Sequence, residues 1–195
     1  MTTETVKEWN SSCGDAHGKD WMDLIGHLAN RPGACGLEVG TFKGDSAEWM
    51  LANIFTGLGS RYVCVDTFEG SVEHHLAGVD CSRLEAMTRD RLKKYSPFVQ
   101  IHKSESAAFL RNPWKQFDFI YIDAAHDAMN VLRDGVLAFD LLKLGGIMLF
   151  DDYGWEVMPE PTDRPKLAID SFLSCYAKRL EVISMGWQVA VKRMK

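Results

Sequence analysis

The chain has 195 residues, of which 46% are hydrophobic and 25% charged, and its formal net charge is −5. This length and composition predict one globular domain with a sizeable core and exclude a disordered chain. No run of Lys and Arg is longer than two residues, so a nucleic acid is not expected as the main partner.

The five cysteines form an odd set without C-x-x-C spacing, which predicts neither a disulfide framework nor a zinc site. The N-terminus lacks the basic and then apolar pattern of a secretion signal. No apolar run approaches the ~20 residues that a membrane span needs. We therefore expect a cytoplasmic protein with no membrane partner, and the sequence leaves open whether it forms a homo-oligomer.

Short apolar runs alternate with segments of helical period along the chain. The runs predict strands at 34–39, 62–66, 99–102, 117–123 and 146–150. Their near-continuous hydrophobicity is typical of strands covered on both faces. The alternation of strand and helix predicts an α/β fold with a parallel, doubly wound sheet and right-handed crossovers.

Local signals predict two of the helices. Ser82 and Glu85 have the spacing of a capping box, which predicts a helix that runs to about Tyr95. A last helix is predicted at 166–180. The residues at 180–193 then predict two strands joined by a tight turn.

Another helix is predicted before the fifth strand. Met129, Leu132, Val136 and Phe139 recur at helical spacing, which predicts the face that packs on the sheet. Gly145-Gly146 then predicts the end of this helix.

Polar and small residues gather where the predicted strands end. In an open α/β sheet, ligands bind outside the carboxyl ends of the strands, so these residues are the candidates for a functional site. In chain order they are Glu38, Gly40, Thr41, Gly44, Asp66, Thr67, Ser104, Glu105, Ser106, Asp123, His126, Asp151 and Asp152.

Gly40 and Gly44 leave the backbone bare where a helix begins, which allows an adenosine-type ligand to lie against the chain. Asp66 ends the second strand and is placed to accept hydrogen bonds from both ribose hydroxyls. The alternative is that the glycines serve only the turn and Asp66 caps the next segment. A dinucleotide is disfavoured because Phe42 stands where the second glycine of G-x-G-x-x-G would be. Glu38 suits a positively charged ligand.

Five stretches resemble, in order, the motifs of class I S-adenosylmethionine-dependent methyltransferases and, more narrowly, of the small-molecule subgroup called methyltransferase 24. They read LEVGTFKGDSAEWML, YVCVDTFEGSVEHHLAGVD, FIYIDAAHD, LLKLGGIMLFDDYGW and PKLAIDSFL. The resemblance covers 33–195 as the methyltransferase domain and leaves 1–32 as an N-terminal helical extension. It implies a Rossmann-like sheet of seven strands, mostly parallel, with an antiparallel last strand.

The resemblance also implies that the cofactor is S-adenosyl-L-methionine. The implied contacts are Glu38, Gly40, Thr41, Gly44, Asp66, Thr67, Ser104, Glu105, Ser106 and Asp123. In this arrangement Glu38 supports the ammonium group of the cofactor and the two glycines accept its methionine part. Residues 104–106 lie on the adenine side.

Asp123, Asp151 and Asp152 would lie at the mouths of two adjacent parallel strands. Carboxylate oxygens there are hard ligands for Mg²⁺ or a similar cation, and the arrangement resembles that of metal-dependent O-methyltransferases acting on catechols and on macrolide sugars. The metal would bind the acceptor hydroxyl, lower its pKa and align it with the sulfonium methyl. Asp151 is the weaker candidate, since successive strand residues point to opposite faces.

His126 lies shortly after Asp123 and would take the proton of the acceptor, so these two residues are the predicted catalytic residues. A metal-free alternative stays open. In that alternative Asp123 orients the cofactor, Asp152 caps the following loop, and His126 caps the helix that starts near Asp127.

Other histidines and one tryptophan are less specific signals. His74-His75 would cover the cofactor, form part of the acceptor pocket or lie in a solvated loop. Trp155 would stack on a ring of the acceptor or pack in the protein. His17, His27 and His102 are expected to be structural.

The predicted function is S-adenosylmethionine-dependent O-methylation of a small-molecule or sugar hydroxyl, assisted by a divalent metal. The alternatives are a metal-independent methyltransferase of another acceptor, a nucleotide-dependent oxidoreductase and a non-catalytic nucleotide-binding module. The missing G-x-G-x-x-G disfavours the oxidoreductase. The acidic pair Asp151-Asp152 favours an enzyme over a binding module.

Overall fold

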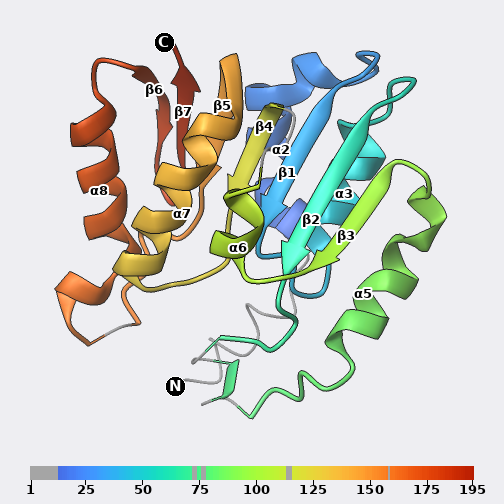
Figure 1. Ribbon diagram of the computed structural model, residues 1–195, viewed down its shortest axis with the longest axis horizontal. Helices are drawn as coiled ribbons and strands as arrows, with labels where there is room; N and C mark the ends of the chain where they lie inside the picture. The colour runs from blue at the N-terminus through green and yellow to red at the C-terminus, as the bar shows by residue number, and fades with distance from the viewer. Residues whose placement is uncertain (1–12, 72–73, 76–77, 113–115, 158) are drawn as a thin grey trace.

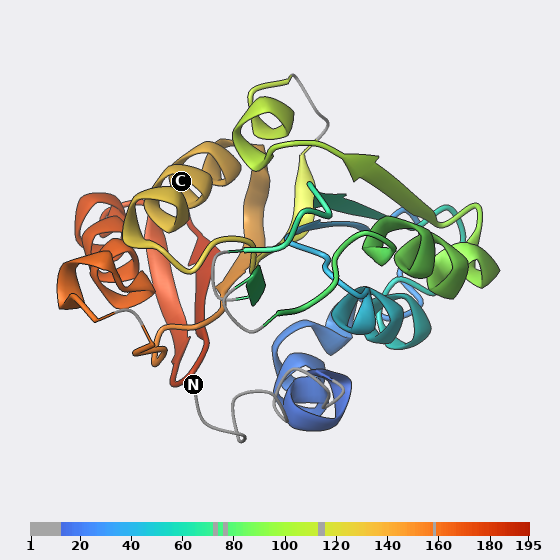
Figure 2. The same cartoon turned by 90° about the horizontal axis from the view of Figure 1, so that it is seen from below.

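A seven-stranded sheet runs through the middle of the structure, with helices on both of its faces (Figures 1 and 2). The computed structural model describes residues 13–71, 74–75, 78–112, 116–157 and 159–195. The strand order is β3-β2-β1-β4-β5-β7-β6. The strands are β1 (Cys35–Val39), β2 (Arg61–Asp66), β3 (Val99–Lys103), β4 (Phe117–Ile122), β5 (Leu142–Phe150), β6 (Leu180–Met185) and β7 (Val189–Arg193).

Strands β1 to β5 pair in parallel, and β7 runs antiparallel between β5 and β6. The predicted Rossmann-like sheet with an antiparallel last strand is therefore confirmed. Strand β5 begins at Leu142 rather than at residue 146, and its pairing with β4 shifts register between Phe117 and Phe119. Strand β3 is partly exposed, so the expectation that every strand is covered on both faces is wrong at this edge of the sheet.

The helices form two layers. α6 (Ser106–Leu110), α7 (Ala128–Leu141) and α8 (Pro165–Tyr176) cover one face of the sheet, and α2 (Cys13–Ile25), α3 (Asp45–Asn53) and α5 (Leu84–Leu92) cover the other (Figure 2). Each layer packs on the sheet through its own hydrophobic cluster. Short 3-10 turns lie at Gly26–Leu28, Lys93–Tyr95 and Pro161–Asp163. Among the described residues, none of the helices combines the length and the apolar character needed to cross a membrane.

Helix α2 belongs to the core. Trp21 and Ile25 are fully buried in the same cluster as Met50 of α3. The ring of Trp21 meets the ring of Tyr121 of β4 edge to face, with 5.7 Å between the centroids. The domain boundary expected at residue 32 stays a prediction, and residues 1–12 of the expected extension lie outside the described residues.

The capping box expected at the start of α5 is wrong. The helix begins after Arg83, and no side chain caps its first turn. The backbone N–H of Ser82 donates to the carboxylate of Asp80 at 2.9 Å, and Glu85 forms an ion pair with Arg89. Glu85 therefore bonds along the helix rather than back to the cap.

The buried face expected for α7 is only partly right, because Phe139 is fully buried and Leu132 packs against the core, whereas Val136 is exposed. Met129 is 77% exposed, whereas the small residues Gly135 and Ala138 face the core. A Cβ at Gly135 would lie 2.8 Å from the ring of Phe150. The small residues let the helix lie close to the sheet, and they share the buried side with Val131 and Phe139.

Gly145-Gly146 does not end α7. The helix ends at Leu141, the next residue is already extended, and the chain enters β5 directly. Gly145, with a φ of +75°, lies inside β5 instead.

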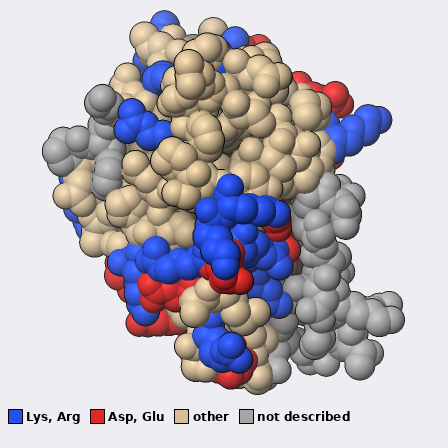
Figure 3. All heavy atoms as spheres, turned by 90° about the vertical axis from the view of Figure 1, so that its right-hand side faces the viewer, with Lys and Arg blue, Asp and Glu red and all other residues tan. Residues whose placement is uncertain are grey.

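Lys and Arg side chains gather on the face formed by α3, α5 and β3, with Asp and Glu among them (Figure 3). The basic residues there are paired with acidic ones. The pairs are Arg91 with Asp45, Lys94 with Glu48, Lys103 with Glu85 and Lys93 with Asp90. These ion pairs offset part of the positive charge on this face.

Gly40 follows β1 and lies directly against the backbone that follows β4. Its φ of +92° lies in the left-handed region that favours glycine. A Cβ at this position would lie 2.0 Å from the carbonyl oxygen of Asp123 and 2.5 Å from the Cα of Ala124. The packing of the chain on itself therefore requires this glycine, in addition to any approach by a ligand.

Gly40→Ala should destabilise the fold strongly. We expect the free energy of unfolding to fall by about 3 kcal/mol or more, because the added methyl group overlaps backbone atoms. Gly59→Ala is the matched control, since its φ is +73° and no atom lies within 4 Å of an added Cβ. That control should lose only about 1 to 2 kcal/mol through backbone strain. Equal losses in urea unfolding would contradict the role of the Asp123 contact.

Candidate active site

A cavity of about 1050 Å³ opens at the carboxyl ends of the parallel strands. Its size is that of a site for a cofactor together with a small molecule. The predicted residues that line it are Gly40, Asp66, Thr67, Ser104, Glu105, Ser106, Asp123, His126, Asp151 and Asp152. Glu38, Thr41 and Gly44 lie off its wall. The structure thus brings most of the predicted site into one cavity.

Glu38 is fully buried in β1. It accepts hydrogen bonds from the hydroxyl of Ser46 and, at 3.8 Å, from the thiol of Cys64. Burial raises the pKa of Glu38 to about 8, and the negative charges of Asp66 and Asp45 add to the rise, whereas the Ser46 bond opposes it. Its role at the ammonium group of a cofactor stays a prediction.

Asp66 orders the loops beside the cavity. Its Oδ2 accepts the backbone N–H groups of Thr41 and Phe42, each at 2.7 Å, and its Oδ1 accepts that of Phe68 at 2.6 Å. Its carbonyl oxygen accepts the N–H of Ser104 at 3.0 Å. These bonds agree with the alternative in which Asp66 orders the local backbone, and ribose binding by its remaining acceptor capacity stays a prediction.

Phe42 is a wall residue that sequence reasoning treated only as a missing glycine. Its φ of +46° is left-handed, as a glycine position would allow. Its ring stacks on the ring of His74, with 4.3 Å between the centroids, and both residues line the cavity. His74 in turn accepts the backbone N–H of Ser71 at 3.1 Å. His74 thus belongs to the wall rather than to a solvated loop.

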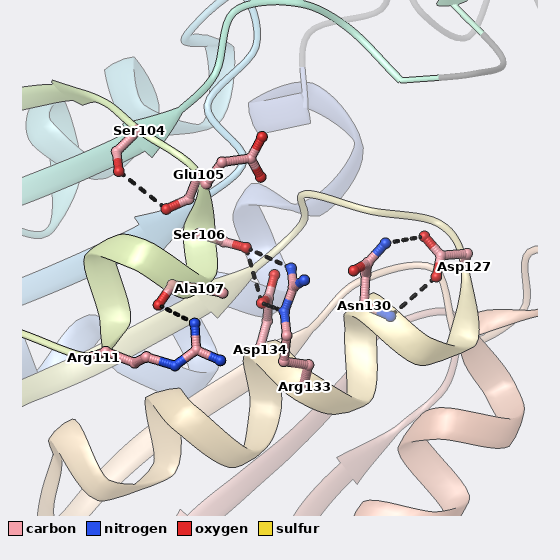
Figure 4. Close-up of polar contacts among 9 residues, drawn as sticks. All are labelled: Ser104, Glu105, Ser106, Ala107, Arg111, Asp127, Asn130, Arg133 and Asp134. Carbon is pink, nitrogen blue, oxygen red and sulfur yellow. Dashed lines mark hydrogen bonds and ion pairs between the residues drawn. The ribbon is translucent and has the colours of Figure 1, made fainter.

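A polar cluster on α6 and α7 forms another part of the wall (Figure 4). The hydroxyl of Ser106 donates to the carboxylate of Asp134 at 2.9 Å and accepts from the guanidinium of Arg133 at 3.0 Å. Burial raises the pKa of Asp134, against the bond from Ser106 and the charge of Arg133. Asp127 caps α7 by accepting the N–H of Asn130 at 3.0 Å, which leaves the capping role considered for His126 to Asp127.

Three ionisable side chains converge where β4 and β5 end. Atoms of Asp123, His126 and Asp152 lie within 4.8 Å of one another, and His126 Nε2 is 2.9 Å from Asp152 Oδ2. Burial raises the pKa of Asp123 well above its usual value, the negative charges of Asp151 and Asp152 add to the rise, and His126 opposes it. Two carboxylates and an imidazole form a donor set that fits a divalent cation. A cation would also offset the repulsion between the carboxylates.

Asp151 lines the same cavity, but its carboxylate has partners of its own. Oδ2 accepts hydrogen bonds from the hydroxyl of Tyr121 and, at 3.0 Å, from Nε2 of Gln188. Oδ1 accepts the backbone N–H of Asp152 at 2.8 Å. Its role as a metal ligand stays a prediction. Nothing in the sequence pattern identified Gln188, because its partners are distant along the chain.

Aromatic side chains stand next to the acidic centre. The rings of Trp155 and His126 are 4.8 Å apart between centroids. Trp187, on the turn between β6 and β7, is 50% exposed and packs over Gly154. Both tryptophans and Val157 line the cavity. This side of the cavity offers an apolar surface to a bound molecule.

A comparison with protein-family models shows the family to which the chain belongs. The model described as "Methyltransferase domain", of the methyltransferase-24 type, matches residues 37–153, which is more than half of the chain. The protein therefore belongs to this family of class I S-adenosylmethionine-dependent methyltransferases. No curated protein is significantly similar to the chain.

Solved structures share the fold at low identity. An O-methyltransferase from Bacillus cereus in complex with SAH is 21% identical, with a TM-score of 0.64 over 91% of this chain and 81% of its own. The O-methyltransferase TomG from Streptomyces achromogenes, in complex with SAM, is 18% identical, with a TM-score of 0.64 over 92% and 80%. MycE from the mycinamycin pathway, in complex with Mg, SAH and mycinamycin VI, is 14% identical, with a TM-score of 0.64 over 92% and 50%.

Glu38→Gln should change how stability depends on pH. The pKa of Glu38 rises from 4.5 to about 8 on folding. Between these values the unfolded chain releases a proton that the folded protein keeps, so the Glu38 contribution lowers stability as pH rises. The variant should therefore gain stability relative to the parent between pH 5 and pH 8, by up to roughly 5 kcal/mol.

Urea unfolding of the parent and the variant across this pH range measures the difference. Glu181→Gln, on the exposed edge strand β6, is the control and should follow the parent. Parallel curves for parent and Glu38→Gln would contradict a buried carboxyl group that stays protonated.

Proposed function

We propose that the protein transfers a methyl group from S-adenosylmethionine to a hydroxyl oxygen of a small molecule, assisted by a divalent cation. The observation that carries this proposal is the meeting of Asp123, His126 and Asp152 in the cavity that Gly40 and Asp66 also line. Fold relatives in complex with SAM, SAH or Mg add support.

The cofactor, when bound, supplies a methyl group on a positively charged sulfur. We propose that it lies along the wall from Gly40 past Asp66 and Thr67 to residues 104–106, since these line the cavity. Phe42 would bound this part of the cavity with its ring. Glu38, Thr41 and Gly44 are further proposed contacts, although they lie off the cavity wall.

The cation would be held by Asp123 and Asp152. When bound, it supplies positive charge that lowers the pKa of a nearby hydroxyl group. Asp151 is proposed as a third ligand on the sequence pattern, but its carboxylate bonds to Tyr121 and Gln188. The first two carboxylates therefore have the stronger support.

His126 is the proposed base. It would accept the proton of the acceptor hydroxyl, and the carboxylate of Asp152, 2.9 Å from Nε2, would stabilise the resulting imidazolium. The oxygen then forms a bond to the methyl carbon while the carbon–sulfur bond breaks. The products are a methyl ether and S-adenosylhomocysteine, and the proton leaves through His126. The cavity walls hold the reacting atoms in line.

A metal-free reaction is the second candidate, and the His126–Asp152 pair favours it. A histidine paired with a carboxylate can act as a base without a cation. Trp155, whose ring contacts His126, would then orient the acceptor.

Loss of the Asp66 carboxylate should weaken cofactor binding. Asp66→Ala removes the anchor of the Thr41 and Phe42 N–H groups and any bond to the ribose, so we expect at least about a tenfold loss of affinity for S-adenosylhomocysteine. Titration calorimetry measures it. Asp90→Ala, an exposed change on α5, should bind as the parent does. Unchanged affinity in Asp66→Ala would reject this part of the site.

The two carboxylates at the acidic centre should be needed for methyl transfer. Asp152 has a φ of +60°, which Asn tolerates, so Asp152→Asn and Asp123→Asn test charge with little change of shape. We expect methyl transfer to fall by about 100-fold or more and Mn²⁺ affinity in calorimetry to fall with it. S-adenosylhomocysteine affinity should change little in Asp152→Asn, whereas Asp123 is also a proposed cofactor contact. Asp163→Asn, at an exposed position of the 3-10 turn Pro161–Asp163, is the control.

Removal of metal gives an independent test of the same centre. Excess chelator should abolish methyl transfer by the parent, and Mg²⁺ should restore it. Full activity in chelator would reject the cation and leave His126 as the base.

A further inference from the structure

Gln188 connects helix α2 to the acidic centre. It lies on the turn between β6 and β7. Its side-chain Oε1 accepts the indole N–H of Trp21 at 2.9 Å, and its Nε2 donates to Asp151 Oδ2 at 3.0 Å and to the hydroxyl of Tyr121 at 3.3 Å. The side chain therefore contacts three other elements of the fold.

Chemistry fixes which way the amide of Gln188 faces. The indole N–H of Trp21 can only donate, so the carbonyl oxygen of Gln188 must face it. The amide NH₂ group then faces Asp151 and donates to its Oδ2. The ring of Trp21 is fully buried against Tyr121 and does not swing away. Gln188 thus bridges the indole N–H of Trp21 and the carboxylate of Asp151.

The carboxylate of Asp151, which Gln188 holds on one side, bonds to the backbone of Asp152 on the other. Its Oδ1 accepts the backbone N–H of Asp152 at 2.8 Å, and the carbonyl oxygen of Asp152 accepts the N–H of Trp155 at 3.0 Å. Asp152 has a left-handed φ of +60°, a conformation that Asp tolerates and that these two hydrogen bonds help to hold. This backbone conformation directs the Asp152 carboxylate to His126.

We propose that Gln188 is a positioning residue, anchored by Trp21, that acts through Asp151 to hold the carboxylate of Asp152 against His126. The proposal rests on the proposed function for its effect on methyl transfer. It assigns helix α2 a part in the reaction, because the anchor of the chain of bonds lies on that helix. A role in stability alone would leave the geometry at His126 unchanged.

Gln188→Glu is the main test. It keeps the size of the side chain and an oxygen acceptor for Trp21, but it places a second carboxylate oxygen against Asp151 in place of the NH₂ donor. Trp21→Phe is a second variant, which removes the indole N–H together with part of the buried ring. Gln100→Glu, on the exposed side of the edge strand β3, is the matched control.

The first readout needs no substrate. In protein labelled with ¹⁵N-histidine, at constant pH, we expect the ring signals of His126 to shift in Gln188→Glu, to shift less in Trp21→Phe, and to stay in place in Gln100→Glu. The ring signals of His27 serve as an internal reference. Unmoved His126 signals in a folded Gln188→Glu protein would overturn the proposal. If that variant does not fold, unmoved signals in Trp21→Phe would do so.

The second readout is kinetic. We expect kcat for methyl transfer to fall about 10- to 100-fold in Gln188→Glu, as for other residues that orient a reactive group through a neighbour, with the KM for S-adenosylmethionine within about twofold of the parent. An unchanged kcat would overturn the proposal. A parent protein without methyl transfer would instead reject the proposed function, and the histidine spectra would still decide the role of Gln188.

Discussion

The contact between Gly40 and the carbonyl of Asp123 sets the arrangement of the whole candidate site. At this point the backbones of β1 and β4 are close enough that a single methyl group would not fit. The residues that follow Gly40 enter the loop held by Asp66, whereas the residues that follow Asp123 lead to His126. One backbone contact therefore joins the cofactor side of the cavity to its acidic side, and the missing side chain of Gly40 makes that contact feasible.

The sheet could be predicted from the sequence because its strands are apolar runs of strand length. The buried face of α7 was predicted only in part, because periodicity weighs large side chains whereas small ones carry part of the close packing. Gly135 lies against the ring of Phe150 on the same side of the helix that buries Phe139, whereas Met129 points to the exposed side. The cap of α5 was misread for a local reason, since the spacing of Ser82 and Glu85 does not fix which partners their groups find.

The carboxylates of the acidic centre could be predicted from the sequence, but the residue that contacts them from β6–β7 could not. Asp123 and Asp152 follow neighbouring parallel strands, and the geometry of such a sheet brings those strand ends together. Gln188 was not predictable, because its partner Trp21 is 167 positions away in the sequence and the bond exists only once α2 packs on the sheet. Residues that react leave a pattern near strand ends, whereas residues that position them are found through tertiary contacts.

The acidic residues that gather at the carboxyl ends of the strands lower the stability of the protein in the absence of a ligand. The raised pKa values of Glu38 and Asp123 mean that the folded state keeps protons which the unfolded chain releases as pH rises above the ordinary carboxyl range. Stability is lost through that interval. A cationic ligand that binds only the folded state offsets the loss, because it favours the ionised carboxylates and adds its own binding free energy. The same raised pKa values therefore suit the proposed cofactor and cation, both of which carry positive charge.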